Sequence, residues 1–305
     1  MKILLIHQNF PGQYKHLGPA FGARGDQVVA LTPKVKSATK WHGVDVIPYR
    51  MNRNSSRDIH RWLGDLESKI NRADSCFQAA MELRQEGFTP DVMLAHSGWG
   101  EPMFLHDVWP TARIGLYYEW HSAEDGAADC FDSKFPAIEP QLARQRLRLR
   151  NLNVKLHWPL TSAAITPTHY QADSYPPAYR DQISVIHDGI DTKRACPNPE
   201  AALVISSDLT LTRNDEVISF INRNLEPSRG YHKFMRVLPD ILRARPQAQV
   251  VVLGGDGVSY GAAPPGGESW KQLYIDEVRD DISDADWARG HFLGRVPYDS
   301  FVSLL

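Results

Sequence analysis

Two arginines that lie six residues apart in the stretch Val217–Gly230 could bind an anion. The stretch reads VISFINRNLEPSRG, so an apolar run ends at Arg223, and a second arginine, Arg229, is followed at once by Gly230. The apolar run predicts a buried strand, and the periodic segment Tyr231–Arg243 predicts a helix that begins beside Gly230. Guanidinium groups suit phosphate oxygens, and a helix N-terminus adds partial positive charge. The pattern favours a phosphate site, although two solvated loop arginines would give the same sequence.

A second group of reactive side chains follows two expected strands, Val92–Ala95 and Ile114–Tyr118. These side chains are His96, Glu101, Glu119 and His121. Because neighbouring parallel strands end at the same edge of a sheet, we expect the four residues on one rim, where imidazole and carboxylate groups can exchange protons. Satisfaction of loop backbone groups is the alternative, above all for His96. The donor set is adequate for zinc, but no H-x-H or H-x-x-x-H pair is present, so no metal site is expected.

The N-terminal segment is expected to supply a further candidate residue at the same edge of the sheet. An apolar run, Lys2–His7, is closed by Phe10-Pro11-Gly12 and followed by the periodic segment Gln13–Ala23. This pattern predicts a buried strand, a turn and a helix. Gly12 would lie at the carboxyl end of the strand, where open α/β sheets bind ligands. A simple strand-to-helix turn without ligand contact remains an equal interpretation of the residues alone.

Alternation of strands and helices predicts the architecture that positions these residues. Apolar runs expected as strands recur along the whole chain, at 28–32, 44–48, 163–166, 183–186, 249–253 and 292–293. Between them lie segments with helical periodicity, the longest at Asp58–Glu86 and Glu139–Trp158. The alternation predicts parallel sheets with right-handed crossovers. We expect an α/β protein with two domains, 1–188 and 189–305, joined at the glycine of His187–Asp191, with a connecting excursion over Ser206–Asp215.

Composition limits the class of protein. A chain of 305 residues, 42% hydrophobic, is long enough for two cores, and its formal charge of −2 gives no indication of nucleic-acid binding. The three cysteines, Cys76, Cys130 and Cys196, have no metal-type spacing, so reduced thiols in a cytoplasmic protein are expected. The arginines within Glu139–Trp158 favour a solvated surface helix. Contact with the inner face of an anionic membrane is the alternative.

The stretch around Arg223 and Arg229 resembles the start of the second domain of the family 4 glycosyltransferases. In that family a strand runs into the pattern G-R-x-x-x-x-x-K-G, and Arg229 stands where the family usually has lysine. The resemblance extends to Gly254-Gly255-Asp256 after the next strand, and to the motif His-x-Asn-Phe-Pro-Gly, found here at residues 7–12. It covers essentially the whole chain.

The resemblance implies the GT-B architecture, two Rossmann-like domains, and a role for each candidate residue. Arg223, Arg229 and Gly230 would hold the diphosphate of a nucleotide-sugar donor, and His121 would point at the transferred sugar. His96, Glu101 and Glu119 would lie on the acceptor side. The remaining nucleotide-pocket candidates are Gly12, Gly254, Gly255, Gly294, Arg295 and Val296. No cofactor and no metal are implied, and no phosphate-loop or dinucleotide fingerprint is present.

The implied activity is transfer of a sugar from a nucleotide sugar to a saccharide or lipid-linked acceptor, with retention of anomeric configuration. The family pattern continues past Leu305 with a donor loop of the form E-x-x-x-x-x-x-x-E. We therefore expect this chain to be inactive alone and to be completed by another polypeptide or by self-association. Two alternatives stay open. One is a non-catalytic acceptor-binding or regulatory protein; the other is a sugar-nucleotide epimerase, which the Arg223/Arg229 pattern fits less well.

Overall fold

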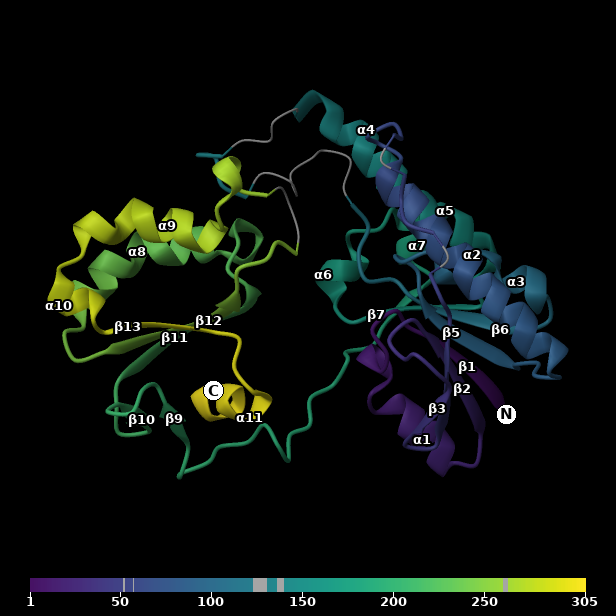
Figure 1. Cartoon of the computed structure of the whole chain (residues 1–305), viewed down its shortest axis with the longest axis horizontal. Helices are drawn as coiled ribbons and strands as arrows, with labels where there is room; N and C mark the ends of the chain where they lie inside the picture. Colours follow the sequence, from purple (N-terminus) through teal and green to yellow (C-terminus); the bar gives the residue numbers. More distant parts are fainter. Residues whose placement is uncertain (52, 57, 123–130, 136–139, 260–262) are drawn as a thin grey trace. The chain divides into compact units, whose positions relative to one another are not determined.

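The computed structural model describes residues 1–51, 53–56, 58–122, 131–135, 140–259 and 263–305 (Figure 1). Cys130 and Glu139, which the sequence analysis named, lie outside these residues. The chain forms two compact units, one comprising Met1–Asp125 with Leu142–Gly189, the other Gly126–Gln141 with Ile190–Leu305. Each unit has its own hydrophobic core.

The first unit is built on an eight-stranded sheet of order β3-β4-β2-β1-β5-β6-β7-β8. All its pairs are parallel except the edge pair β3–β4. The strands are β1 (Lys2–Ile6), β2 (Gln27–Thr32), β3 (Thr39–Trp41), β4 (Val44–Pro48), β5 (Val92–His96), β6 (Arg113–Tyr117), β7 (Ala163–Thr166) and β8 (Ile183–Val185). The sequence analysis missed only β3, because three residues with mostly exposed side chains give no apolar signal.

Both faces of this sheet are covered, because successive side chains of each buried strand point to opposite sides. Leu4 and Ile6 pack into the core on the face of the long helix α2, whereas Ile3 and Leu5 pack on the face of α1. The helical elements of the first unit are η1 (Gly12–Tyr14), α1 (Leu17–Ala23), α2 (Gly64–Gln85), η2 (Glu101–Phe104), α3 (Leu105–Val108), α5 (Leu152–His157), η3 (Trp158–Leu160), α6 (His169–Ala172) and α7 (Pro177–Arg180). Helix α4 (Pro140–Arg150) ends in the same unit.

The second unit contains a three-stranded parallel sheet, β11-β12-β13, and an antiparallel hairpin, β9-β10. Its strands are β9 (Ala202–Val204), β10 (Thr210–Thr212), β11 (Val217–Asn224), β12 (Gln249–Gly255) and β13 (Gly290–Gly294). The helical elements are η4 (Pro227–Arg229), α8 (Tyr231–Ala244), η5 (Pro265–Gly267), α9 (Trp270–Val278), η6 (Arg279–Asp281), α10 (Asp284–Trp287) and α11 (Tyr298–Leu304). Helices α8 and α9 cover one face of the sheet, and the hairpin with α11 covers the other (Figure 1).

Residues 131–135 belong to the second unit, although they precede most of the first unit's last helices in sequence. Asp132 receives hydrogen bonds from Arg236 of α8 and Tyr274 of α9, and the ring of Phe135 lies edge-on to Trp270 with centroids 5.3 Å apart. A single boundary at 188/189 therefore misplaces this segment. Sequence periodicity could not show the exchange, because the five residues are too few to carry a pattern.

Candidate functional site

The carboxyl edge of the first sheet holds a bonded imidazole–carboxylate pair. His96 ends β5, and its Nε2 lies 3.0 Å from Oε2 of Glu119, which follows β6. The Gly98 amide donates to His96 Nδ1 at 2.9 Å, so the ring proton is on Nε2 and is donated to Glu119. The indole of Trp99 stacks on the imidazole, with centroids 4.1 Å apart and planes 5° apart. The two predicted rim residues are thus brought together as predicted from the strand order.

His7, at the end of β1, extends this pair towards Gly12. Its Nδ1 accepts from the Asn9 amide at 3.0 Å, and Nε2 contacts Gln13 Oε1. A Cβ at Gly12 would lie 2.1 Å from the His7 ring, so only glycine fits at this position. Burial lowers the pKa of His7, and the nearby imidazole of His96 lowers it further, while the bond to Gln13 opposes both effects. His7 is therefore a neutral hydrogen-bonding group near neutral pH.

Glu101 does not lie on the open rim where the sequence analysis expected it. Its side chain is 1% exposed, and Oε1 accepts from the hydroxyl of Tyr49 at 2.8 Å. The chain turns inward at η2, because Gly100 adopts a φ of 96° before it. Burial raises the pKa of Glu101 to about 6. An acceptor-side role for this carboxyl group has no support from its position.

His121 follows β6 and is also largely buried, with 7% of its surface exposed. Its amide donates to Ser174 Oγ at 3.1 Å, and its ring lies 5.4 Å from that of Tyr175. The structure places His121 at the carboxyl edge of the sheet, two residues after Glu119. Its role towards a transferred sugar stays a prediction.

In the second unit, Arg229 and Gly230 lie directly before α8. Arg229 Nε lies 3.5 Å from Oε1 of Glu226, a fully buried carboxylate whose Oε2 accepts from the Ser259 amide at 2.8 Å. Gly230 has a φ of 79° and forms the N-cap of α8, and a Cβ there would meet no atom within 4 Å. The first amides of a helix have no partner within the helix, so this end of α8 presents donors and a partial positive charge.

Arg223 is exposed near the end of β11, and among the described residues its guanidinium makes no hydrogen bond or ion pair. Its neighbours in the strand behave differently. Asn222 donates to the carbonyl of Arg229 at 3.3 Å, and Asn224 bonds to groups of the next two loops. The structure therefore does not bring Arg223 and Arg229 into contact.

Loops that follow all three strands of the second sheet meet at Asn224. Its Nδ2 donates to Ser259 Oγ at 2.6 Å, and its Oδ1 accepts from Arg295 Nη2 at 3.1 Å. A Cβ on Gly255 would lie 2.8 Å from Arg295 Nε and 2.9 Å from Asn224 Oδ1, so glycine is needed for this approach. Gly255 ends β12 and Ser259 lies in the loop after it, whereas Arg295 directly follows β13. The guanidinium of Arg295 is therefore the second one held at this edge, in addition to that of Arg229.

The other predicted pocket residues of the second unit occupy the same edge with different roles. A Cβ on Gly254 would lie 2.6 Å from the side chain of Leu225, so Gly254 serves close packing. Gly294 turns the chain after β13 with a φ of 66°. The side chain of Val296 packs in the core beneath the sheet, which leaves only its backbone for a ligand.

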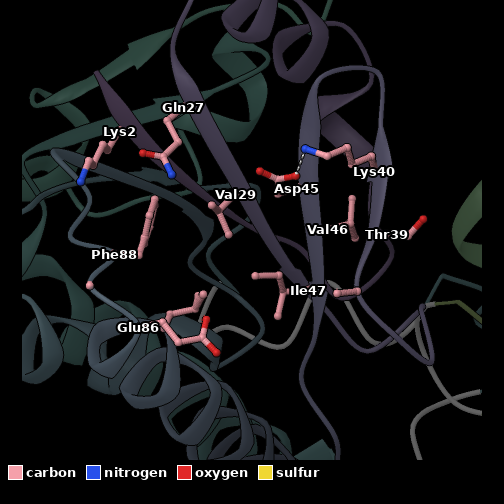
Figure 2. A pocket seen from close by; sticks show the side chains of 13 residues that line it. Lys2, Gln27, Val29, Thr39, Lys40, Asp45, Val46, Ile47, Glu86 and Phe88 are labelled. Carbon is pink, nitrogen blue, oxygen red and sulfur yellow. Dashed lines mark hydrogen bonds and ion pairs between the residues drawn. The ribbon is translucent and has the colours of Figure 1, made fainter.

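A cavity of about 520 Å³ lies elsewhere, at the amino ends of β1, β2 and β4 (Figure 2). Its floor is apolar, with Val29, Ile47 and Phe88 facing inward, and Lys40 and Asp45 form an ion pair of 2.6 Å at its margin. Because ligands of open parallel sheets bind at the carboxyl ends of strands, we assign the chemistry to the edges described above and not to this cavity.

Among the residues that the structure describes, no three or more His, Cys, Asp or Glu side chains are grouped so that they could hold a metal ion. No helix in the described part of the chain has the length and apolarity required to cross a membrane.

Several residues at these edges were not selected as candidates from the sequence: His7, Gln13, Trp99, Asn224, Glu226 and Ser259. His7 could have been found, because it ends an apolar run in the same way as His96. Asn224 and Glu226 could also have been found, because they lie at or just after the end of the apolar run that precedes Arg229. For Trp99 and Ser259 the sequence contains no signal, since their partners come from other loops.

Two units with parallel sheets, each with its polar groups at the carboxyl edge, define the GT-B class of α/β folds. Solved structures agree, over 99% of this chain in each of the following cases. Sucrose-phosphate synthase from Thermosynechococcus elongatus is 14% identical with a TM-score of 0.64, over 72% of that chain. The catalytic domain of starch synthase IV from Arabidopsis thaliana is 13% identical with a TM-score of 0.59, over 76% of its length. A UDP-forming trehalose-phosphate synthase from Burkholderia xenovorans is 12% identical with a TM-score of 0.54, over 75%.

Residues 24–195 match the model of the glycosyl transferase family 4 group. This match spans more than half of the chain, so the protein belongs to the glycosyl transferase family 4 group and is a glycosyltransferase. A search of curated proteins gave no significant match. The predicted fold class and family are thereby confirmed, and the family match favours transfer over the epimerase alternative.

Proposed function

We propose that this glycosyltransferase uses a nucleoside diphosphate sugar and binds its diphosphate at the carboxyl edge of the second sheet. The observation that carries the proposal is the meeting of three loops at Asn224, which holds Arg295 Nη2 3.1 Å from Asn224 Oδ1 at the edge of the sheet from which the chain enters α8. A diphosphate needs several positively charged donors at one place, and this edge supplies guanidinium groups and free helix amides.

The charges around Arg229 and Arg295 differ, and the roles that we propose for them rest on this difference. Arg229 is paired with the buried carboxylate of Glu226, which orients its guanidinium and offsets its charge. Arg295 is exposed and is held by the neutral amide oxygen of Asn224. Its full positive charge is therefore directed to a ligand, and we assign it the larger share of diphosphate binding. Arg223 contributes from the more exposed margin.

In the first unit we propose that the acceptor is bound beside Glu119. The Glu119 carboxylate accepts a hydrogen bond from His96 Nε2–H. It is exposed enough to accept a further hydrogen bond from a hydroxyl group of an incoming saccharide. His121, buried against Tyr175, would contact the transferred sugar after a small side-chain movement. Retention of configuration without a covalent intermediate, and a saccharide or lipid-linked acceptor, are part of the proposal.

Calorimetric titration of the full chain with UDP, GDP and ADP tests the donor site. ADP is included because the starch synthase IV structure holds ADP together with acarbose. Charge-assisted hydrogen bonds are worth about 1.5–3 kcal/mol, so Arg229→Ala and Arg295→Ala should each weaken binding of the preferred diphosphate by about tenfold or more.

Arg243→Ala is the matched control, because among the described residues this exposed arginine at the other end of α8 bonds to Asp240 and the Asp281 carbonyl. Its affinity should equal that of the wild type. Equal affinities for the wild type, Arg229→Ala and Arg295→Ala would overturn the diphosphate site.

We also propose that the protein works in the cytoplasm, with at most peripheral membrane contact. Leu147 of α4 is buried in the core, so the apolar side of this helix packs inward and its exposed arginines face solvent. Sedimentation with phosphatidylserine vesicles at physiological salt should leave the protein in the supernatant. Binding that is lost on Arg146→Glu would instead support a membrane-bound enzyme.

A further inference from the structure

An exposed aromatic pair lies next to Glu119 in the first unit. Trp120 is 40% exposed and Tyr170 is 76% exposed, and their ring centroids are 5.6 Å apart with planes inclined by 35°. One follows β6 and the other lies on α6, so the two rings come from neighbouring strand ends. Large aromatic surfaces are costly to leave in water, and such a pair at a functional edge indicates a binding surface.

Trp120 is fixed by its two chain neighbours. On one side Glu119 accepts from His96 at 3.0 Å, and on the other the His121 amide donates to Ser174 Oγ at 3.1 Å. Both neighbouring partners, His96 and Ser174, belong to other segments of the first unit. The indole is thus held at the edge of the sheet by the loops around it, which reduces the entropy lost when a ligand binds.

Tyr170 is fixed through the short helix α6. Thr168 Oγ1 accepts from the Gln171 amide at 3.2 Å and caps this helix, while Ser174 Oγ donates to the Gln171 carbonyl at 2.7 Å. Ser174 therefore bonds both to the helix that carries Tyr170 and to the loop that carries Trp120. This serine therefore links the two segments that carry the rings.

The chemistry of the pair fits a sugar ring. A pyranose presents C–H groups on its faces and hydroxyls around its edge, and aromatic rings with one polar atom match both. Neither the indole N–H nor the Tyr170 hydroxyl has a hydrogen-bond partner among the described residues. The carboxylate of Glu119, one residue from Trp120, can accept a sugar hydroxyl.

A nucleotide would suit this place less well. The carboxylate of Glu119 repels phosphate, and the guanidinium nearest to α6, that of Arg180, is paired with Asp173 at 2.6 Å. We propose that Trp120 and Tyr170 form a stacking platform for a pyranose ring of the acceptor, with Glu119 as its hydroxyl acceptor. This inference rests on the proposed function, since it names the acceptor's binding place for that reaction.

Saturation-transfer NMR on the full chain tests the platform, with methyl α-glucopyranoside, maltotriose, cellotriose and chitotriose at millimolar concentration as probes. At least one probe should receive saturation from the wild type, chiefly at ring C–H protons. Trp120→Ala and Tyr170→Ala should each raise its dissociation constant by about two- to tenfold, the range expected for one aromatic contact. Trp120→Phe keeps a ring and should recover most of the affinity, and it also serves if Trp120→Ala fails to fold.

Phe104→Ala is the matched control, since it removes another partly exposed aromatic ring of the same unit. Its affinity should equal that of the wild type. No saturation transfer to any probe would overturn the platform. So would affinities of Trp120→Ala and Tyr170→Ala equal to that of the wild type. Titration of the same variants with UDP, GDP and ADP separates the two proposals. Weakened sugar binding with intact diphosphate binding in the Trp120 and Tyr170 variants supports the platform. In the wild type, diphosphate binding without sugar binding contradicts the platform alone, and sugar binding without diphosphate binding contradicts the donor site alone.

Discussion

The guanidinium of Arg236 donates to both carboxylate oxygens of Asp132, at 3.1 Å and 2.7 Å. Asp132 is buried and also accepts from the Tyr274 hydroxyl at 2.9 Å. Arg236 is shared with Glu277, which lies 2.8 Å from its Nε. This bidentate pair attaches the segment 131–135 to helices α8 and α9.

Removal of this pair should destabilise the second unit. Asp132→Ala leaves Arg236 with one carboxylate and should lower the free energy of unfolding by about 2–3 kcal/mol. Asp240→Ala is the control, because its pair with Arg243 is exposed and should contribute little. Urea denaturation followed by tryptophan fluorescence measures both. Equal losses for the two variants would show that the segment is not held by this pair.

The same carboxylate should make the second unit sensitive to acid. Burial alone would raise the pKa of Asp132, but hydrogen bonds from Arg236, the Lys134 amide and Tyr274 outweigh it and lower the pKa to about 2 from 3.8. The folded state therefore binds fewer protons than the unfolded state, and the stabilisation is lost as pH falls from about 4 to about 2. Asp132→Asn should show a flatter decline of unfolding free energy over this window.

Glu101 should act in the opposite direction. Burial raises its pKa from 4.5 to about 6, so the folded state binds more protons between these values. The contribution of Glu101 to the free energy of unfolding is complete below pH 4.5 and is lost as pH rises through 6. This loss amounts to about 2 kcal/mol. Glu101→Gln should remove this loss. His157, whose pKa burial lowers to about 4, has the contrary slope, so the difference between wild type and variant is the quantity to follow.

Gly255→Ala should disturb the diphosphate site with little effect on the fold. The added methyl group would lie 2.8 Å from Arg295 Nε and 2.9 Å from Asn224 Oδ1, so the guanidinium must move. We expect weaker binding of nucleoside diphosphates by about tenfold, measured by calorimetry. Gly64→Ala, at the start of α2 with open space around it, is the control. Unchanged affinity of Gly255→Ala for nucleoside diphosphates would show that Arg295 does not take part in binding them.

His121 should affect turnover more than nucleotide binding. The proposed diphosphate site is built from residues of the second unit, so His121→Ala and the more conservative His121→Asn should leave UDP, GDP and ADP affinity nearly unchanged. In the completed enzyme, transfer from radiolabelled nucleotide sugars to a crude acceptor extract should fall below that of the wild type. Normal transfer by both variants would return this histidine to a packing role against Tyr175.

The parallel strands and their carboxyl ends could be predicted, because buried strands are continuous apolar runs and His96 and Glu119 directly follow two of them. The β9–β10 hairpin was missed, since each of its strands has only three residues and buries only the middle one, Leu203 or Leu211. The helical periodicity within Asp58–Glu86 also did not identify which side chains of α2 are buried. Ile70 is 43% exposed, whereas Lys69 is buried and bonds to Asp65 and Asn153.

Site details that depend on distant partners could not be predicted. Glu101 is buried because Tyr49, from the end of β4, supplies its hydrogen bond, and no local pattern links the two. The same holds for Asn224, whose partners Ser259 and Arg295 come from two later loops. Residue type and position at a strand end locate a site, but the neighbours that orient its side chains come from tertiary contacts.

The placement of residues 131–135 has a consequence for how such a protein can be divided in evolution. The second unit is not encoded by one continuous stretch of the gene, because the codons for Asp132 and Phe135 lie between those for the two segments of the first unit. Replacing residues 190–305 with the corresponding half of a relative would leave the second unit without its own Arg236 and Trp270 partners unless both segments were inherited together. Recombination at the apparent linker should therefore be disfavoured, and the two halves should change in step at these positions.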